Sequence, residues 1–353
     1  MAEEKGSATI RAVAARAGVS VATVSRVINN PESVSETRRE KVSTAIRELN
    51  YIPNPVAKAL GSSKLRSLAI VVPTVVNTFM AAAMGGIIEV LEQSSYDALL
   101  FDAQESFERE RQFFTILPNK MIEAAIFIGG AGQQLDFSAL AERMPVALIA
   151  RSETPENVSA FIGDELQGMK RLVVHLVDLG HTEIGLISGT MNSTDGVRRF
   201  GMFKQALESE GLEWRAENCV VGEWTIEGGY QSMQKLLKKR NPPTAVICAT
   251  DIMAQGALGA AYQGGVRVPQ DVSVVGFDNA LGSAYLAPPL TTLKYPSYRM
   301  GKMAAKSVLQ KLEHNSTEYV HKQLPLELLP RQSSGPAPGE DDRAEAPGGE
   351  RNR

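Results

Sequence analysis

The segment from Ala17 to Asn30, AGVSVATVSRVINN, carries side chains that core packing does not account for. Ser20 is a good N-cap, because its hydroxyl can accept hydrogen bonds from the free N–H groups of a first helical turn. Val24, Val27 and Ile28 then fall on one face at helical spacing. We expect a partner outside the core to contact the side chains that point elsewhere in the first turns: Val21, Ala22, Ser25 and Arg26.

Charge is unevenly distributed along the 353 residues. Residues 1–66 hold eleven Lys and Arg against six Asp and Glu, a net charge of +5, whereas the remainder holds 26 against 34, a net charge of −8. A basic segment on an acidic body indicates that only this segment meets a polyanion. A chance fluctuation in a short segment is the alternative explanation of the charge by itself.

The elements that position these side chains read as three short helices. Thr9 is placed to cap the first, Gly18 ends it, Ser20 starts the second and Ser35 is placed to cap the third. Two helices joined by a tight turn containing glycine, with a third helix supporting them, are typical of a helix-turn-helix unit.

A short linker follows, with the sequence YIPNPVAKALGSSK. Asn54 suits an N-cap, Pro55 the first helical position and Gly61 the position beyond the end. A helix of about two turns is too short to be stable alone. We therefore predict a linker helix that forms only when it packs on something.

From Ser67 onwards, short apolar runs such as LAIVV, AAIFIGG and VSVVGF alternate with amphipathic helical stretches. This pattern predicts doubly wound parallel α/β sheets, and the length suggests two lobes. After about Gln332 the chain is rich in Pro, Gly and charge, which predicts a disordered tail. The expected domains are 1–50 (helix-turn-helix), 51–65 (hinge helix and linker), 66–332 (two-lobed body) and 333–353 (tail).

One uncharged stretch, Ser67 to Ile88, is long enough to span a membrane. Pro73 and Asn77 interrupt it, and LAIVV reads as a buried strand, so we expect no membrane partner. The start MAEEKGSATIRAV lacks the apolar stretch of a signal peptide. Two cysteines in apolar runs, Cys219 and Cys248, suggest buried reduced thiols, and a cytoplasmic location is expected.

The chain has no sequence motif of an enzyme. Its four histidines are scattered without metal-ligand spacing, and neither a nucleophile elbow nor a phosphate-binding glycine loop is present. We expect no catalytic residue, no metal and no cofactor. A solute-binding protein would share the two-lobed body, but it would have no use for a basic head.

Three segments follow one another along the chain. They are VAARAGVSVATVSRVIN, then VSETRREKVSTAIRELNYIPNPVAKAL, and then the body, which contains LVDLGHTEIGLISG, ATDIMAQGAL and VSVVGFDNALGSAYLAPPLTTLKYP. In this the chain resembles the lac/galactose repressor (LacI/GalR) family from about Thr9 to about Arg331. The resemblance implies a sequence-specific transcriptional regulator, a repressor of carbohydrate-related genes, that binds double-stranded operator DNA as a homodimer.

The resemblance places the second helix in the major groove. Val21 and Ala22 would then contact bases through apolar surface, and Arg26 can donate two hydrogen bonds to guanine. Hydroxyl groups in the same region suit phosphate oxygens, which position the helix without specifying sequence. The hydroxyl-bearing residues assigned to DNA are Thr9, Ser20, Thr23 and Ser25.

The resemblance also assigns a role to the linker. Two hinge helices, one from each subunit, would pack in the minor groove, with Leu60 wedged into a central C·G step of a near-palindrome. Asn54 and Ala57 would lie along the groove wall.

For the body, the resemblance implies a small sugar-like effector between the lobes. Arg198 would offer a fork of donors, Asp278 would accept from hydroxyls, and Trp224 would stack on a sugar ring. Asn77 and Phe79 match the first-lobe side, and Arg151, Asp164 and Thr250 are weaker candidates. Thr250 and Ala150 depart from the family pattern, so no particular sugar follows. A corepressor or a phosphoprotein partner remains an alternative to an inducer.

Overall fold

The structure is a computed structural model that describes residues 9–51, 66–119, 122–130, 135–151 and 154–339. The chain divides into two compact units, Met1–Leu65 and Arg66–Arg353. We call the first unit the head and the second the body. The linker residues Asn54, Ala57 and Leu60 lie outside the described residues.

The head is a bundle of short helices around a small apolar core. Its elements are α1 (Ile10–Ala17), α2 (Val21–Asn29), a 3-10 turn (Pro31–Ser33) and α3 (Glu36–Glu48). Gly18 ends α1 in the left-handed region at φ 65°, where a side chain would be strained. The Ser20 hydroxyl accepts from the N–H of Thr23, as its N-cap position predicts, whereas Ser35 occupies its cap position without such a bond. The core side chains are Val13, Ala14, Ala17, Val24, Val27, Val42 and Ala45.

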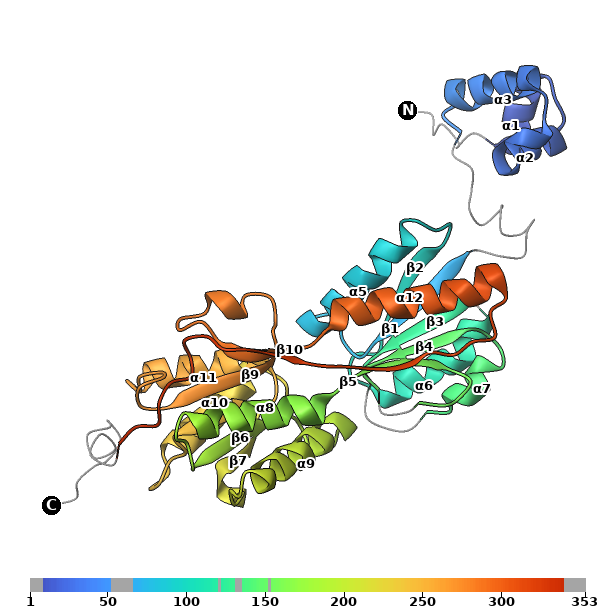
Figure 1. The fold of residues 1–353 in the computed structure, drawn as a ribbon. Coiled ribbons are helices and arrows are strands. Elements are labelled where there is room, and N and C mark those ends of the chain that lie inside the picture. The colour runs from blue at the N-terminus through green and yellow to red at the C-terminus, as the bar shows by residue number, and fades with distance from the viewer. Residues whose placement is uncertain (1–8, 52–65, 120–121, 131–134, 152–153, 340–353) are drawn as a thin grey trace. The chain divides into compact units, whose positions relative to one another are not determined.

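The body contains two six-stranded sheets, each the centre of one lobe (Figure 1). The first lobe has the strand order β11-β5-β4-β3-β1-β2 and is parallel throughout. The second lobe has the order β12-β10-β9-β8-β6-β7, and only the β10–β12 pair is antiparallel. The doubly wound α/β body and the helical head expected from the sequence are confirmed.

The bounds of the elements follow the chain through both lobes. The first lobe comprises β1 (Ser67–Val72), α5 (Thr78–Leu91), β2 (Asp97–Asp102), α6 (Phe107–Ile116), β3 (Ile122–Ile128), α7 (Phe137–Ala141), β4 (Val146–Ile149), β5 (Ser159–Gly163), α12 (Ser297–His314) and β11 (His321–Leu324). The second lobe comprises α8 (Glu165–Asp178), β6 (Ile184–Ser188), α9 (Thr194–Ser209), β7 (Cys219–Val221), α10 (Ile226–Leu237), β8 (Ala245–Cys248), α11 (Asp251–Gln263), β9 (Ser273–Asp278), β10 (Thr291–Lys294) and β12 (Glu327–Leu329). The chain thus passes between the lobes after β5, after β10 and after β11.

Buried strands place alternate side chains in different cores. In β1, Leu68, Ile70 and Val72 join the core under α5 and α12, while Ala69 and Val71 join the core under α6 and α7. Figure 1 shows these helix pairs on opposite faces of the first sheet. A strand covered on both faces needs apolar residues at every position, which explains the continuous run LAIVV.

The uncharged stretch from Ser67 to Ile88 forms β1 and most of α5, so it contributes to the fold of the first lobe. No helix in the described part of the chain is long and apolar enough to cross a membrane.

The expectation of a disordered tail from residue 333 is wrong for residues 333–339. Ser333 is fully buried, and its hydroxyl accepts from the N–H of Thr291 and donates to the carbonyl of Val274. The Gly335 N–H donates to Ser273, and the Gly335 carbonyl lies 3.0 Å from Nε2 of the buried His181. Composition predicted disorder because it does not register these hydrogen bonds to the second sheet. Residues 340–353 lie outside the described part.

Replacement of Ser333 tests this anchoring. In Ser333→Ala the Thr291 N–H and the Val274 carbonyl lose a buried partner, so the free energy of unfolding should fall by about 1–3 kcal/mol. Urea unfolding of the purified protein measures the change. Ser209→Ala, at an exposed serine at the end of α9, is the control and should change stability little. An unchanged midpoint in Ser333→Ala would contradict the anchoring.

Candidate functional site

A cavity of about 270 Å³ lies between the two lobes, and we call it the inter-lobe cavity. Parallel strands of one sheet all end at the same edge, so the residues that follow them converge there. The loops after β1 to β4 contribute Pro73, Glu105, Gly130 and Ala150. The second lobe contributes residues that end or follow its strands: Thr190, Trp224, Thr250, Asp278 and Tyr295.

Strained backbone is concentrated around this cavity. Four of its lining residues other than glycine have positive φ angles: Glu105 (54°), Ala150 (53°), Trp224 (61°) and Asp278 (110°). Such conformations cost roughly 1–3 kcal/mol each and persist where the surrounding structure fixes them, commonly at ligand-binding sites. The strain therefore marks the inter-lobe cavity as a functional site.

The structure brings six of the eight sequence-predicted effector residues to the inter-lobe cavity. These six are Asn77, Phe79, Arg198, Trp224, Thr250 and Asp278. Asn77 also caps α5 by accepting from the N–H of Phe79, and Thr250 caps α11. Their roles toward a ligand stay predictions.

Two predicted effector residues do not line the inter-lobe cavity. Arg151 is buried and turned away from it, where its guanidinium pairs with Glu110, donates to the Gly129 carbonyl and stacks over Phe137. Asp164 caps α8 by accepting from the N–H of Gln167. Both residues follow a strand, but protein groups close to them in space already bind their side chains.

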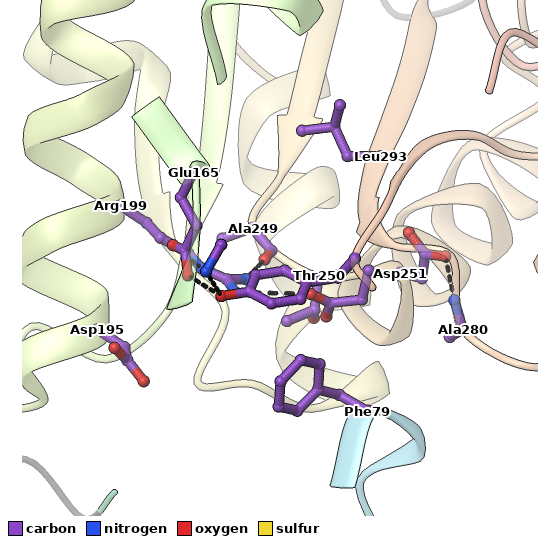
Figure 2. Close-up of polar contacts among 12 residues, drawn as sticks. Phe79, Glu165, Asp195, Arg199, Ala249, Thr250, Asp251, Ala280 and Leu293 are labelled. Carbon is purple, nitrogen blue, oxygen red and sulfur yellow. Dashed lines mark hydrogen bonds and ion pairs between the residues drawn. The ribbon is translucent and has the colours of Figure 1, made fainter. Parts of the chain in front are cut away.

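A buried ion network forms one wall of the inter-lobe cavity (Figure 2). Glu165 Oε2 lies 2.9 Å from Arg198 Nη1 and 3.4 Å from Arg199 Nε. Arg199 also lies 3.5 Å from Asp278 and donates to the Ala249 carbonyl. Tyr295 donates to Glu165 Oε1 at 3.1 Å and accepts from the N–H of Gly163. Burial opposes the charge of Arg199, yet Glu165 and Asp278 raise its pKa above the usual value, so Arg199 stays cationic.

Two buried carboxyl groups titrate abnormally. Burial raises the pKa of Asp278 to about 8, although Arg199 lowers it in part. Burial also raises the pKa of Asp251 to about 6, while hydrogen bonds from Ser283, Thr292 and the Ala280 N–H oppose the rise. Asp251 thereby fixes the loop that follows Asp278 (Figure 2).

Sequence reasoning missed nine charged or hydrogen-bonding residues of the cavity, and four of them matter most to its charge and its buried network. These four are Glu165, Asp195, Arg199 and Tyr295. One signal could have found Arg199, because it shares the buried face of α9 with Phe203 and Ala206 at helical spacing. The sequence analysis chose its neighbour Arg198, whose side chain is 27% exposed.

In the head, α2 leaves one face open. Val21 is 41% exposed, and Ala22 and Arg26 are also exposed. Among the described residues Arg26 has no ion-pair partner. The hydroxyls of Thr9 and Ser20 cap α1 and α2, and Thr23 lies 2.9 Å from Ser20. Ser25 is half-buried. Across the described residues, no cluster of His, Cys, Asp and Glu could hold a metal ion.

Comparisons with known proteins match both units. Residues 9–54 match the family model of bacterial regulatory proteins, lacI family, and residues 173–334 match that of a periplasmic binding protein-like domain. The HTH-type transcriptional repressor PurR of Serratia proteamaculans (strain 568) is 32% identical over 344 residues, which cover 95% of this chain and 99% of PurR.

Two solved structures are similar over nearly the whole chain. The lac repressor dimer bound to operator and the anti-inducer ONPF has a TM-score of 0.82 at 29% identity, covering 94% of this chain and 100% of that chain. The complex of the transcriptional regulator CelR with cellobiose has a TM-score of 0.69 at 28% identity, covering 93% and 100%.

The raised pKa of Asp278 predicts how stability depends on pH. Its folded-state pKa of about 8 exceeds the ordinary 3.8, so the folded state binds more protons. The free energy of unfolding should therefore fall as the pH rises from 5 to 8. Asp278→Asn should reduce this fall by at least about 1 kcal/mol, as measured by urea unfolding. Asp97→Asn, at an exposed position, should keep the wild-type dependence, and an equal fall in Asp278→Asn would contradict the assignment.

Proposed function

Because the chain belongs to the lacI family of bacterial regulatory proteins, we propose that it represses transcription by binding a near-palindromic operator as a homodimer. A small polyhydroxy, sugar-like effector in the inter-lobe cavity controls this binding. The exposed face of α2 carries the proposal, because a helix that packs through one side leaves Val21, Ala22 and Arg26 open to a ligand. A repressor of this kind works in the cytoplasm and catalyses no reaction.

The residues of α2 divide by the chemistry they offer to DNA. Arg26 has a planar fork that suits O6 and N7 of guanine, and Val21 and Ala22 suit thymine methyl groups. Thr9, Ser20, Thr23 and Ser25 lie at or near the helix starts, where a hydroxyl that accepts from the backbone can still donate its own proton to a phosphate. Base recognition thus rests on three exposed side chains.

Symmetry requires two heads on one operator. A homodimer reads two half-sites related by a twofold axis, so the operator is a near-palindrome. The lac repressor relative forms a dimer on its operator. The family resemblance assigns Asn54 and Ala57 to the minor groove at the centre of the site and Leu60 to the central step, and all three lie outside the described residues.

The mixture of donors and acceptors that line the inter-lobe cavity favours hydroxyl groups as ligands. The guanidinium of Arg198, which is 27% exposed, supplies donors, and the carboxylate of Asp195, which is 40% exposed, supplies acceptors. A hydroxyl both donates and accepts, so adjacent hydroxyls satisfy both kinds of atom. The cavity of about 270 Å³ has room for a compound of about the size of a monosaccharide. Trp224 gives this cavity an aromatic face, and the CelR relative binds cellobiose.

Selection of bound duplexes from a random library, with and without a mixture of sugars, tests this function. Enrichment of a near-palindrome supports the head assignment, and no enriched duplex in either condition argues against it. Loss of the enriched site on adding sugar identifies an inducer, and gain identifies a corepressor, because the ligand stabilises whichever state it binds better.

Arg26→Ala should weaken operator binding and relax the preference at one base pair in each half-site. The loss of one two-bonded guanine contact corresponds to about 1–3 kcal/mol per half-site. Fluorescence anisotropy with labelled operator at fixed salt measures it. Arg47→Ala, which removes an exposed charge from α3, is the control and should keep the base preference. An unchanged preference in Arg26→Ala would exclude base reading by this residue.

Arg198→Ala should abolish the effector response while operator affinity stays at the wild-type value. The cavity then loses a donor, and Glu165 keeps its contact with Arg199. Operator release or retention is titrated against the sugar found in the selection. Arg215→Ala removes the Arg215–Glu183 ion pair, which lies outside the inter-lobe cavity, and should respond as the wild type does. A normal response in Arg198→Ala would place the effector elsewhere.

A further inference from the structure

We propose that Asp195 makes the inter-lobe cavity reject anions, so that the effector carries neither a phosphate nor a carboxylate group. This inference rests on the proposed effector function of the same cavity and specifies its ligand. It also assigns a specificity-determining role to a residue that the sequence analysis did not select.

The start of α9 and the two arginines beside the inter-lobe cavity resemble an anion-binding site. Thr190, Asn192 and Ser193, just before α9, line it together with the first turns of that helix. The start of a helix carries partial positive charge and outward N–H groups, which favour phosphate and carboxylate ligands. Arg198 and Arg199 add two full positive charges one turn further along. From these features alone, a sugar phosphate or a sugar acid would be the expected ligand.

Carboxylates of the protein already bind these cations. Asp195 accepts a hydrogen bond from Arg198 Nη2 at 2.6 Å, while Arg198 Nη1 pairs with Glu165. Arg199 pairs with Glu165 and Asp278 and donates to the Ala249 carbonyl. The ion-pairing capacity that an anionic ligand would need is therefore taken up within the protein.

The net charge of the side chains that line the cavity also disfavours an anionic ligand. Among the described residues, two guanidinium groups and four carboxyl groups line the inter-lobe cavity. The lining side chains sum to −2 when Asp278 is ionised and paired with Arg199, and to −1 when Asp278 is protonated. An anion would lose its hydration on entering and would meet repulsion that the shielded arginines do not offset. The lining residues with ionisable side chains are Arg198, Arg199, Glu105, Glu165, Asp195 and Asp278.

Asp195 is the carboxylate whose place an anionic ligand would take. Glu165 is 2% exposed and holds both arginines together with Tyr295, so it belongs to the wall of the cavity. Asp195 is 40% exposed, and in Figure 2 it stands apart from the Glu165–Arg199 contact. It lies in the first turn of α9 and binds the partly exposed guanidinium of Arg198. A solvent-exposed ion pair contributes little to stability, so its main effect is on the charge that a ligand meets.

Titration of the full-length protein with inorganic phosphate tests this role by isothermal calorimetry at pH 7 and low ionic strength. The variant is Asp195→Asn, which keeps the size of the side chain and removes its charge. The matched control is Glu108→Gln, because Glu108 pairs with Arg111 three residues on in the first turn of α6, outside the inter-lobe cavity. Both variants lose one carboxylate from a helical carboxylate–arginine pair.

The wild type and Glu108→Gln should show no saturable phosphate binding up to about 10 mM. Asp195→Asn should bind at least about tenfold more tightly, because one repulsive charge is gone and Arg198 Nη2 loses its carboxylate partner, while Nη1 stays paired with Glu165. Arg198→Ala in the Asp195→Asn background should remove this binding. Saturable binding by the wild type that Arg198→Ala abolishes, or no gain in Asp195→Asn, would overturn the inference. The titration uses no DNA, so its failure is distinguishable from failure of the repressor function.

Discussion

The buried carboxylate of Glu165 is the contact on which the geometry of the body depends. Glu165 stands just after the first crossing between the lobes, and it accepts from Tyr295, which stands on the second crossing. It also holds Arg198 and Arg199 of the second lobe. Removal of one partner from such a buried group typically costs 3–5 kcal/mol, because the remaining charges stay unpaired in a poor solvent. One side chain thus joins two crossings to the wall of the inter-lobe cavity.

The same network prepares the inter-lobe cavity for a ligand. Ion pairs with Glu165, Asp195 and Asp278 hold Arg198 and Arg199 in place before any ligand arrives. Preorganised polar groups reduce the ordering cost of binding. The positive φ angles at Trp224 and Asp278 cost conformational free energy, and packing in the surrounding sheets offsets this cost. The cavity is consequently selective through the pairing of its charges as well as through its shape.

The head is stabilised by a much smaller apolar core than the body. Its core consists of seven small side chains, Val13, Ala14, Ala17, Val24, Val27, Val42 and Ala45, drawn from three helices. Such a core positions α2 from one side only, so the other side stays open. The inter-lobe cavity is instead assembled from segments spread over more than 200 residues, from Pro73 to Tyr295. Recognition of DNA therefore relies on a local pattern, whereas recognition of an effector relies on the whole body.

The sequence alone determined what depends on short-range physics. Helix caps, a glycine turn and helical spacing specified the head and the open face of α2, because these signals act within a few residues. Apolar runs alternating with amphipathic stretches specified the α/β body, since strands buried on both faces need continuous apolar residues. Six of the eight residues that the family resemblance assigned to the effector cavity do line it, and two of them, Thr250 and Asp278, lie at strand ends that converge at one edge of a parallel sheet.

Only the tertiary structure decided which charged side chains pair. Arg151 follows a strand end as a ligand-binding residue would, but Glu110, 41 residues earlier, draws it away from the cavity. Arg199 and Glu165 are 34 positions apart and meet because α8 and α9 pack side by side. Residues 333–337 are ordered by hydrogen bonds to Thr291, Val274 and Ser273, which no composition rule detects. Electrostatic pairing and buried hydrogen bonds depend on distance in space, and sequence patterns carry only distance along the chain.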